Sequence, residues 1–462
     1  MSFTSPLFYA ALAAAAVAFY LLPGRWRAIY LLALSYAYYA LSSRIYLLLL
    51  IVASAAIYAL GIAIAKSGSE RAKQAYIAAG VAAVVAVIVA FKAAGAWRGL
   101  LLSLGVSYYS FKLISYLIEV YWDHEAVERN PVVFFLFPAF FPQIVSGPIQ
   151  RPEPFFTQMR EVMGRRLDAD QLETGCRLIL GGLMMKLLVG DRLAAFINLI
   201  DTSHTDYSYS IMLTTATCYL LQLYADFAGY TNIALGIGQL FGIEGPPNFR
   251  APFTSVNVQE FWRRWHMSLT SWVTDYLFTP LSMSLRGLGQ VGLVLCIMLN
   301  MLIIGLWHGL TLDFLVFGLS QGILVSVTAL IVMSRRRAGA KPASGPRWLA
   351  VAGMILTFAL MTLSTIFWHS PTLGEATSIL KQVLAISPSG SIGWSEVPAS
   401  LTIPVWICMA VALFVGAGAP GATRLVARID TVAPEWLQYG VCLFLLSVLS
   451  TAGSGRFVYG QF

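Results

Sequence analysis

The stretch from Asp226 to Gly309 decides the fold of this chain, because it places polar and ionisable residues between and inside apolar segments. It contains DFAGYTNIALG (Asp226–Gly236), NFRAPF (Asn248–Phe253), EFWRRWHMSLTSWVTDYLF (Glu260–Phe278) and GLWHG (Gly305–Gly309). A charged side chain at bilayer depth costs roughly 3 kcal/mol or more unless it lines a cavity or has a partner. These polar residues therefore indicate a functional site within a membrane.

The composition of the whole chain is that of a membrane protein. Of its 462 residues, 58% are hydrophobic and 11% are charged, whereas a soluble domain has roughly 25% charged residues. Several apolar runs approach or exceed the roughly 20 residues that cross a hydrocarbon core. We therefore predict an all-α polytopic membrane protein with about ten or eleven transmembrane helices and further re-entrant or interfacial helices. We predict a single domain over residues 1–462, with a motif core at about 140–320.

The charge and the cysteines exclude several classes of function. The net charge is +8, but lysine and arginine lie in short loops between the apolar runs, where they set membrane orientation rather than bind nucleic acid. The five cysteines are scattered without a CxxC pair, so neither a disulfide framework nor a zinc site is predicted. We predict no metal and no bound cofactor. The alanine-rich helices and the absence of organelle signals favour a bacterial inner membrane.

The predicted helices follow the apolar runs along the chain. They cover residues 6–22, 28–42, 45–65, 75–91, 173–200, 210–242, 288–306, 309–333, 348–368, 401–417 and 436–452. Polar residues within 99–122 predict a helix buried among others, and the prolines of Pro131–Pro148 predict a broken or re-entrant helix. Placing the basic loops near the start of the chain inside, such as Pro23–Arg27 and Lys66–Gln74, predicts an N-terminus outside. The basic segment Ser334–Arg347 is also predicted to be cytoplasmic, which places a loop at 370–400 outside.

His308 is the first candidate for chemistry, because it ends an apolar helix at membrane depth. A buried neutral imidazole is a competent general base for a hydroxyl group. The alternative is a structural histidine that is hydrogen-bonded to a neighbouring carbonyl. Asp313 lies five residues further on, about 140° round a continuous helix, so it is not an obvious orienting partner.

His266 lies in a segment that we predict as one amphipathic helix over Glu260–Tyr276. Stepping about 100° per residue puts its aromatic residues on one stripe with His266 at the edge, and the charged residues lie towards the other side. Such a helix is suited to a membrane interface or to the floor of a cavity. Arg263 and Arg264 could bind a phosphate or an acidic partner, or could simply be interfacial anchors.

Asp226 and Asn232 interrupt an otherwise apolar helix. A buried acid there needs a partner, so a substrate or proton-relay role and a structural hydrogen bond both remain open. In VSGPIQ (Val145–Gln150), Gly147 and Pro148 are typical of a turn that shapes the backbone. His124, His204 and His369 are predicted at loop ends as ordinary surface or interface residues.

Taken together, these motifs resemble the membrane-bound O-acyltransferases. The resemblance rests on five segments in order: FFPQIVSGPIQRPEPF (Phe140–Phe155), LYADFAGYTNIALGIGQLFG (Leu223–Gly242), NFRAPF, EFWRRWHMSLTSW and GLWHG. It points to the bacterial branch that modifies cell-surface polymers, which includes alginate and peptidoglycan O-acetyltransferases and the membrane subunit of teichoic-acid D-alanylation. The resemblance implies a ring of helices around a central funnel or tunnel. It also implies that His308 is the principal catalytic residue and that His266 supports catalysis or the donor side.

The resemblance implies transfer of an acyl group, D-alanyl or acetyl, from a cytoplasmic thioester to a hydroxyl outside. The donor would be acetyl-CoA or a loaded phosphopantetheine carrier protein. The expected partners are membrane lipid, that carrier, an extracytoplasmic accessory or relay protein, and an acceptor glycan or teichoic-acid-like polymer. The predicted donor-binding or supporting residues are Asp226, Asn232, Arg263, Arg264, Trp265, Trp307, Ser146, Gly147 and Pro148. The alternative is a transporter or flippase that moves an envelope precursor without forming a bond.

Overall fold

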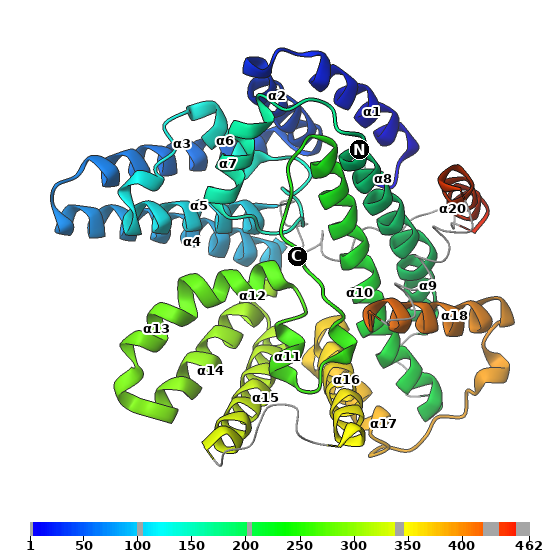
Figure 1. Cartoon of the computed structure of the whole chain (residues 1–462). Coiled ribbons are helices and arrows are strands. Elements are labelled where there is room, and N and C mark those ends of the chain that lie inside the picture. Colours follow the sequence, from blue (N-terminus) through cyan, green and yellow to red (C-terminus); the bar gives the residue numbers. More distant parts are fainter. Residues whose placement is uncertain (1–2, 99–104, 201–205, 338–345, 419–433, 450–462) are drawn as a thin grey trace. The chain divides into compact units, whose positions relative to one another are not determined.

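The computed structural model describes residues 3–98, 105–200, 206–337, 346–418 and 434–449. Within these ranges the chain folds into helices with no β-strand; Tyr207 and Ile392 form one isolated bridge. The all-α prediction is therefore confirmed. The chain divides into two compact units (Figure 1): among the described residues, unit 1 comprises 3–183 and 229–247, and unit 2 comprises 184–228 and 248–449.

Unit 1 is built from the N-terminal helices. These are α1 (Pro6–Leu21), α2 (Gly24–Ser42), α3 (Arg44–Lys66), α4 (Glu70–Arg98), α5 (Val106–Trp122), α6 (Pro131–Ala139), α7 (Pro152–Val162), α8 (Ala169–Met184, except Met184 itself) and the end of α10 from Gly229 onward. Helix α5 packs against α3, α4 and α6, and most of its residues are buried. The prediction of a buried helix after Gly99 is confirmed from Val106 onward.

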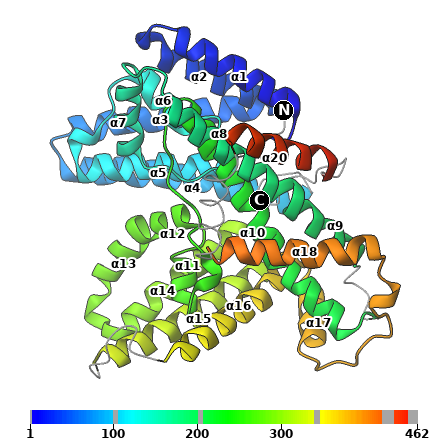
Figure 2. The same cartoon turned by 45° about the vertical axis from the view of Figure 1, so that its right-hand side comes forward.

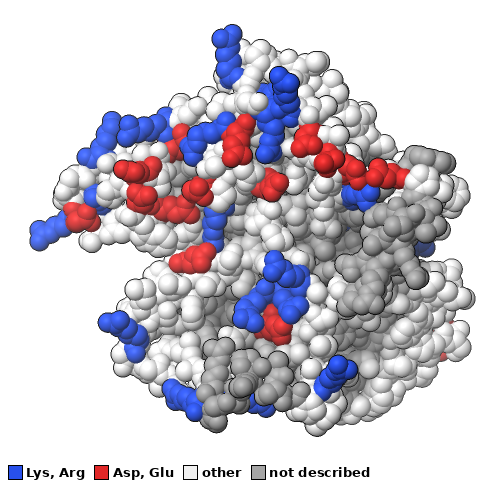
Figure 3. Space-filling model, in the orientation of Figure 1, with Lys and Arg blue, Asp and Glu red and all other residues white. Residues whose placement is uncertain are grey.

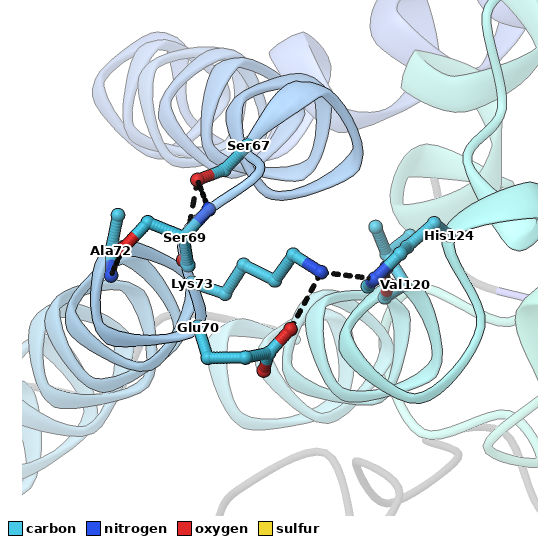
Figure 4. Close-up of polar contacts among 7 residues, drawn as sticks. All are labelled: Ser67, Ser69, Glu70, Ala72, Lys73, Val120 and His124. Atoms are coloured by element: carbon cyan, nitrogen blue, oxygen red, sulfur yellow. Dashed lines mark hydrogen bonds and ion pairs between the residues drawn. The ribbon is translucent and has the colours of Figure 1, made fainter.

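A polar contact ties the start of α4 to the end of α5 (Figure 4). Lys73 Nζ lies 2.8 Å from Glu70 Oε1 and 2.5 Å from His124 Nε2. His124 Nδ1 lies 3.0 Å from the carbonyl oxygen of Val120. His124 therefore has a structural contact, which agrees with its prediction as an interface residue.

Unit 2 contains the remaining elements. They are the π-helix η2 (Met185–Gly190), α9 (Asp191–Leu199), the first part of α10 (Tyr209–Leu240), α11 (Val258–Trp262), α12 (Met267–Val273), the π-helix η4 (Thr274–Phe278), α13 (Thr279–Ser284), α14 (Gly289–His308), α15 (Leu312–Arg337), α16 (Arg347–His369), α17 (Leu373–Val383), α18 (Ala399–Gly416) and α20 (Glu435–Leu449). Helices α14 and α15 run side by side (Figure 2) and make extensive contact.

Among the described residues, six helices are long and apolar enough to cross a membrane. They are Arg44–Lys66, Glu70–Ala93, Arg286–His308, Leu312–Arg335, Arg347–His369 and Ala399–Gly416. Helices Pro6–Leu21 and Leu437–Leu449 are apolar but shorter. Many large apolar side chains are exposed on these helices, and Figure 3 shows wide areas without charged side chains. These features indicate a multi-pass membrane protein, because lipid replaces water around such surfaces.

Two predicted elements need correction. Residues 370–400 were predicted as a loop, but Leu373–Val383 form α17, whose first turn is capped by the Thr372 side chain. The helix predicted over Glu260–Tyr276 is wrong, because the chain breaks between α11 and α12 and continues into η4. By contrast, the broken helix predicted for Pro131–Pro148 is confirmed: α6 ends at Ala139 and irregular backbone follows. His204 and the centre of the basic segment, residues 338–345, lie outside the described residues.

Candidate active site

His308 is the last residue of α14, and the tight hairpin between α14 and α15 fixes its position. Gly305 lies so close to α15 that a Cβ added there would stand 2.5 Å from the carbonyl oxygen of Phe314 and 2.9 Å from Gly318 Cα. A Cβ on Gly318 would in turn stand 2.8 Å from the carbonyl oxygen of Met301. The glycines therefore let two helix backbones approach closely, as small residues do in membrane helix pairs.

Replacement of Gly305 by alanine is expected to destabilise the hairpin by about 1–3 kcal/mol, because backbone atoms of α15 would have to move. Gly287→Ala is the matched control, since no atom lies within 4 Å of a Cβ at that position. Thermal unfolding of the two purified variants in detergent measures the difference. Equal stability of the two variants would contradict the close packing.

Aromatic rings surround the imidazole of His308, which is 3% exposed. Its ring centroid lies 4.1 Å from that of Trp368 and 4.5 Å from that of Trp307. Phe314 lies 6.2 Å away on α15 and also contacts Trp368. The imidazole is therefore held in an apolar setting that excludes water, where a neutral ring can act as a base.

His266 lies at the break between α11 and α12, and its backbone is in the left-handed conformation, with φ 46° and ψ 49°. Such a conformation is rare for a residue with a side chain and is found at functional sites. This strained residue is the physical reason that one continuous helix does not form here. The His266 side chain is buried, 1% exposed.

The ring of Trp307 lies between the two histidines in a chain of contacts. Its centroid is 6.2 Å from that of His266 and 4.5 Å from that of His308. On the other side of His266, the ring of Phe227 packs edge-on at 4.6 Å. The structure thus brings His266 together with Trp307 and His308, two neighbouring residues predicted for the site that lie far from it in the sequence.

Burial also sets the protonation state of His266, which lies outside the six candidate spans. Burial lowers the pKa of its imidazole to about 3, because the charged form would lose its hydration. His266 is therefore neutral at physiological pH and can exchange hydrogen bonds with a substrate without carrying a charge.

Asp226 has the partner that its burial requires. Lys186 Nζ, on η2, lies 2.5 Å from Asp226 Oδ1 and 2.7 Å from Asp191 Oδ1. The exposed fraction of each of these three side chains is 5% or less. Asp226 therefore belongs to a buried ion cluster, which favours a structural role. It also anchors α10 next to Phe227, the residue that contacts His266.

The arginines and Trp265 occupy different parts of the same segment. Arg263 is exposed, whereas Arg264 pairs with Glu260 at 2.7 Å. Trp265 is buried, and its ring stacks on Phe261 with centroids 5.2 Å apart. Trp265 is thus a packing residue. Of the two arginines, only Arg264 has an acidic partner among the described residues.

The other predicted supporting residues belong to unit 1. Ser146 and Pro148 are buried and Asn232 is half-buried. A Cβ on Gly147 would stand 2.3 Å from Gln143 Cα, so a residue with a side chain does not fit at this position in the turn.

Hydrogen bonds fix both sides of that turn. Lys112 Nζ donates to Gln143 Oε1 at 2.9 Å, Gln143 Nε2 donates to Gln150 Oε1 at 2.7 Å, and Gln150 Nε2 donates to the carbonyl oxygen of Glu244 at 2.8 Å.

Sequence reasoning missed Trp368, Lys186 and Asp191. Trp368 is the second-last residue of α16, and an aromatic residue near the end of an apolar run is too common to be a signal. The lysine is a stronger signal, because a charged residue inside the apolar run 173–200 demands a partner. His369, predicted as an ordinary residue, stacks on Tyr219 with centroids 4.2 Å apart. No group of three or more potential metal ligands occurs in the described ranges.

Comparison with known proteins identifies the family. The model of the membrane-bound O-acyltransferase family matches residues 35–368, a range that includes both histidines. The chain belongs to this family. It is 30% identical over 284 residues to a probable alginate O-acetylase of Pseudomonas aeruginosa, covering 60% of this chain and 50% of that protein.

Two other relatives represent different activities. The chain is 29% identical to a peptidoglycan O-acetyltransferase of Helicobacter pylori, over 62% of this chain and 58% of that protein. It is 31% identical to a teichoic acid D-alanyltransferase of Bacillus subtilis, over 55% of this chain and 65% of that protein. The chain thus spans about half the length of the alginate enzymes that it matches.

Proposed function

We propose that this protein is a membrane O-acyltransferase, which moves an acyl group from a cytoplasmic thioester to a hydroxyl of an extracytoplasmic envelope polymer or relay protein. The observation that carries the proposal is the pair of buried histidines on the two sides of Trp307. Family membership and the printed activities of the relatives, O-acetylation and D-alanylation, support it. The protein would lie in a bacterial inner membrane with its N-terminus outside.

In the proposed reaction, His308 accepts the proton of the acceptor hydroxyl while the hydroxyl oxygen attacks the thioester carbonyl. The new carbon–oxygen bond forms, the carbon–sulfur bond breaks, and the proton passes to the departing thiolate. A thioester is already activated, so the protein supplies proximity, one base and exclusion of water. His266, neutral and buried, would orient the thioester or the hydroxyl.

The donor is proposed to be acetyl-CoA or an acylated phosphopantetheine on a carrier protein. An accessory protein outside the membrane would present or relay the acceptor. Helices arranged around a funnel or tunnel would let donor and acceptor meet at His308. Arg263, exposed and without an acidic partner among the described residues, is available to the phosphate groups of such a donor.

The flippase alternative loses one of its supports. A transport role would use Asp226 as a free intramembrane acid, but its carboxylate is paired with Lys186. A buried carboxylate held in this way is a structural element rather than an open binding site.

Mass spectrometry of ester-linked groups tests the proposed function. Cell envelopes and exported glycans are compared between a host that carries the protein and the same host without it. The expected result is the loss of one class of ester, acetyl or D-alanyl, when the protein is absent. An unchanged set of esters, together with relocation of an unmodified precursor, would contradict acyl transfer and support the flippase.

A further inference from the structure

Asp313 is a buried carboxylate that the proposed mechanism does not use. It lies in the first turn of α15, five residues after His308, and its side chain is 5% exposed. Its Oδ1 atom is buried and accepts no hydrogen bond from any residue that the structure describes. Asp226 and Asp191 each have an ion pair with Lys186, although Asp191 Oδ2 likewise accepts no hydrogen bond from the described residues.

A buried carboxylate oxygen without a hydrogen-bond partner is unfavourable, so its presence calls for a compensating group. An ion loses its hydration when it is buried, which costs free energy. The positive end of the α15 dipole offsets only part of that cost. A ligand that brings a positive charge would balance the remainder, because a neutral hydroxyl would leave the charge uncompensated.

The hairpin holds Asp313 in the part of the site that contains His308. The next residue, Phe314, contacts the rings of His308 and Trp368 at 6.2 and 5.4 Å. A Cβ added to Gly309 would stand 2.3 Å from the Phe314 ring, so Gly309 and Phe314 pack closely in this turn. Asp313 is therefore the chain neighbour of a ring that contacts the candidate base.

The chemistry of the acyl group supplies a cation at this place. During transfer the acyl carbonyl carbon must lie beside His308. In an aminoacyl group the ammonium is bound to the carbon next to that carbonyl, whereas an acetyl group carries nothing there. A negative side chain near the reacting carbonyl therefore distinguishes the two classes of donor.

We propose that Asp313 binds the ammonium group of an aminoacyl thioester, so that the acyl group transferred is of the D-alanyl class and not acetyl. This inference rests on the proposed function, and it names the acyl group that the proposed function left open. The carboxylate would act in substrate recognition and would take no part in proton transfer.

The test uses two phosphopantetheine thioesters that differ only in the ammonium group, D-alanyl and propionyl. Inverted membrane vesicles that contain the full-length protein receive each donor with a radiolabelled acyl group. Base-labile label on the endogenous acceptors is measured over time. The protein variants are wild type, Asp313→Asn and Asp206→Asn, the last being an exposed aspartate of the same unit.

The wild type is expected to transfer D-alanyl in preference to propionyl. Asp313→Asn should lose roughly 30- to 5,000-fold in kcat/KM for D-alanyl, the range seen when one partner of a buried charge pair is removed. Transfer of propionyl by this variant should be unchanged or increased, and Asp206→Asn should behave as wild type.

Two results would overturn the inference while leaving acyl transfer in place: an equal loss for both donors in Asp313→Asn, or a wild-type preference for propionyl. A third result, no labelling from either donor by the wild type, would overturn this inference, and the comparison of envelope esters would then decide whether acyl transfer fails with it. Retention of propionyl transfer by Asp313→Asn also shows that the variant is folded.

Discussion

Replacement of His308 by alanine is expected to reduce acyl transfer by about 10²–10⁴-fold, the usual contribution of a positioned general base. The imidazole is buried among Trp307, Trp368 and Phe314, so no solvent base can take its place at the same distance. The protein should still insert and fold, because the lost side chain is one of several rings in this cluster. The measurement is the initial rate of acyl ester formation in membrane vesicles.

Two further variants make the result specific to the base. His308→Gln keeps a polar side chain of similar length but cannot accept a proton, so it should be nearly as inactive as His308→Ala. His124→Ala is the control histidine, because its contacts are with Lys73 and Val120 in unit 1. Near-normal transfer by His308→Ala would exclude the proposed mechanism, and equal losses in His124→Ala would show that general damage explains the effect.

The hydrophobic pattern predicted most helices because membrane helices must satisfy their backbone hydrogen bonds within the segment. The apolar run at 45–65 became Arg44–Lys66, and the run at 348–368 became Arg347–His369. The pattern failed at Glu260–Tyr276, where the left-handed backbone of His266 interrupts a good amphipathic repeat. The hydrophobic periodicity predicts which face of a helix is apolar, but it does not predict that one residue, His266, has a positive φ angle.

The candidate site was predicted only in part, for a related reason. His266 and His308 were visible because histidine is rare in apolar segments. Trp368 and Lys186 were not assigned, because His308 lies 60 residues from Trp368 and Asp226 lies 40 residues from Lys186, and only packing brings each pair together. The sequence motifs therefore predicted the two histidines, but only the folded structure shows which residues surround them.

The substitution Lys186→Met is expected to have the largest effect on stability. It removes the cation that lies between Asp191 and Asp226 and leaves two buried carboxylates facing an apolar side chain. Removal of one partner from a buried ion pair costs about 3–5 kcal/mol, a large fraction of the total stability of a protein. Thermal unfolding in detergent is expected to show a lowered midpoint, or too little folded protein to measure.

A matched control and a compensating variant show whether the loss of stability comes from the unbalanced buried charge or from the loss of a lysine side chain in general. Lys381→Met removes a lysine that is exposed on α17 and should leave stability unchanged within about 0.5 kcal/mol. Lys186→Met combined with Asp226→Asn leaves one buried acid instead of two, so it should recover part of the lost stability. If Lys186→Met were as stable as Lys381→Met, the cluster would not be a structural anchor.

The same cluster should also affect catalysis, because it fixes α10 where Phe227 packs against His266. In the compensated double variant part of the lost stability is recovered but the ionic anchor is absent. We therefore expect this variant to transfer acyl groups more slowly than wild type. Its unfolding temperature should be at least as high as that of Gly305→Ala, so that instability does not explain the slower transfer. Wild-type rates in the double variant would show that the ion cluster stabilises unit 2 without positioning His266.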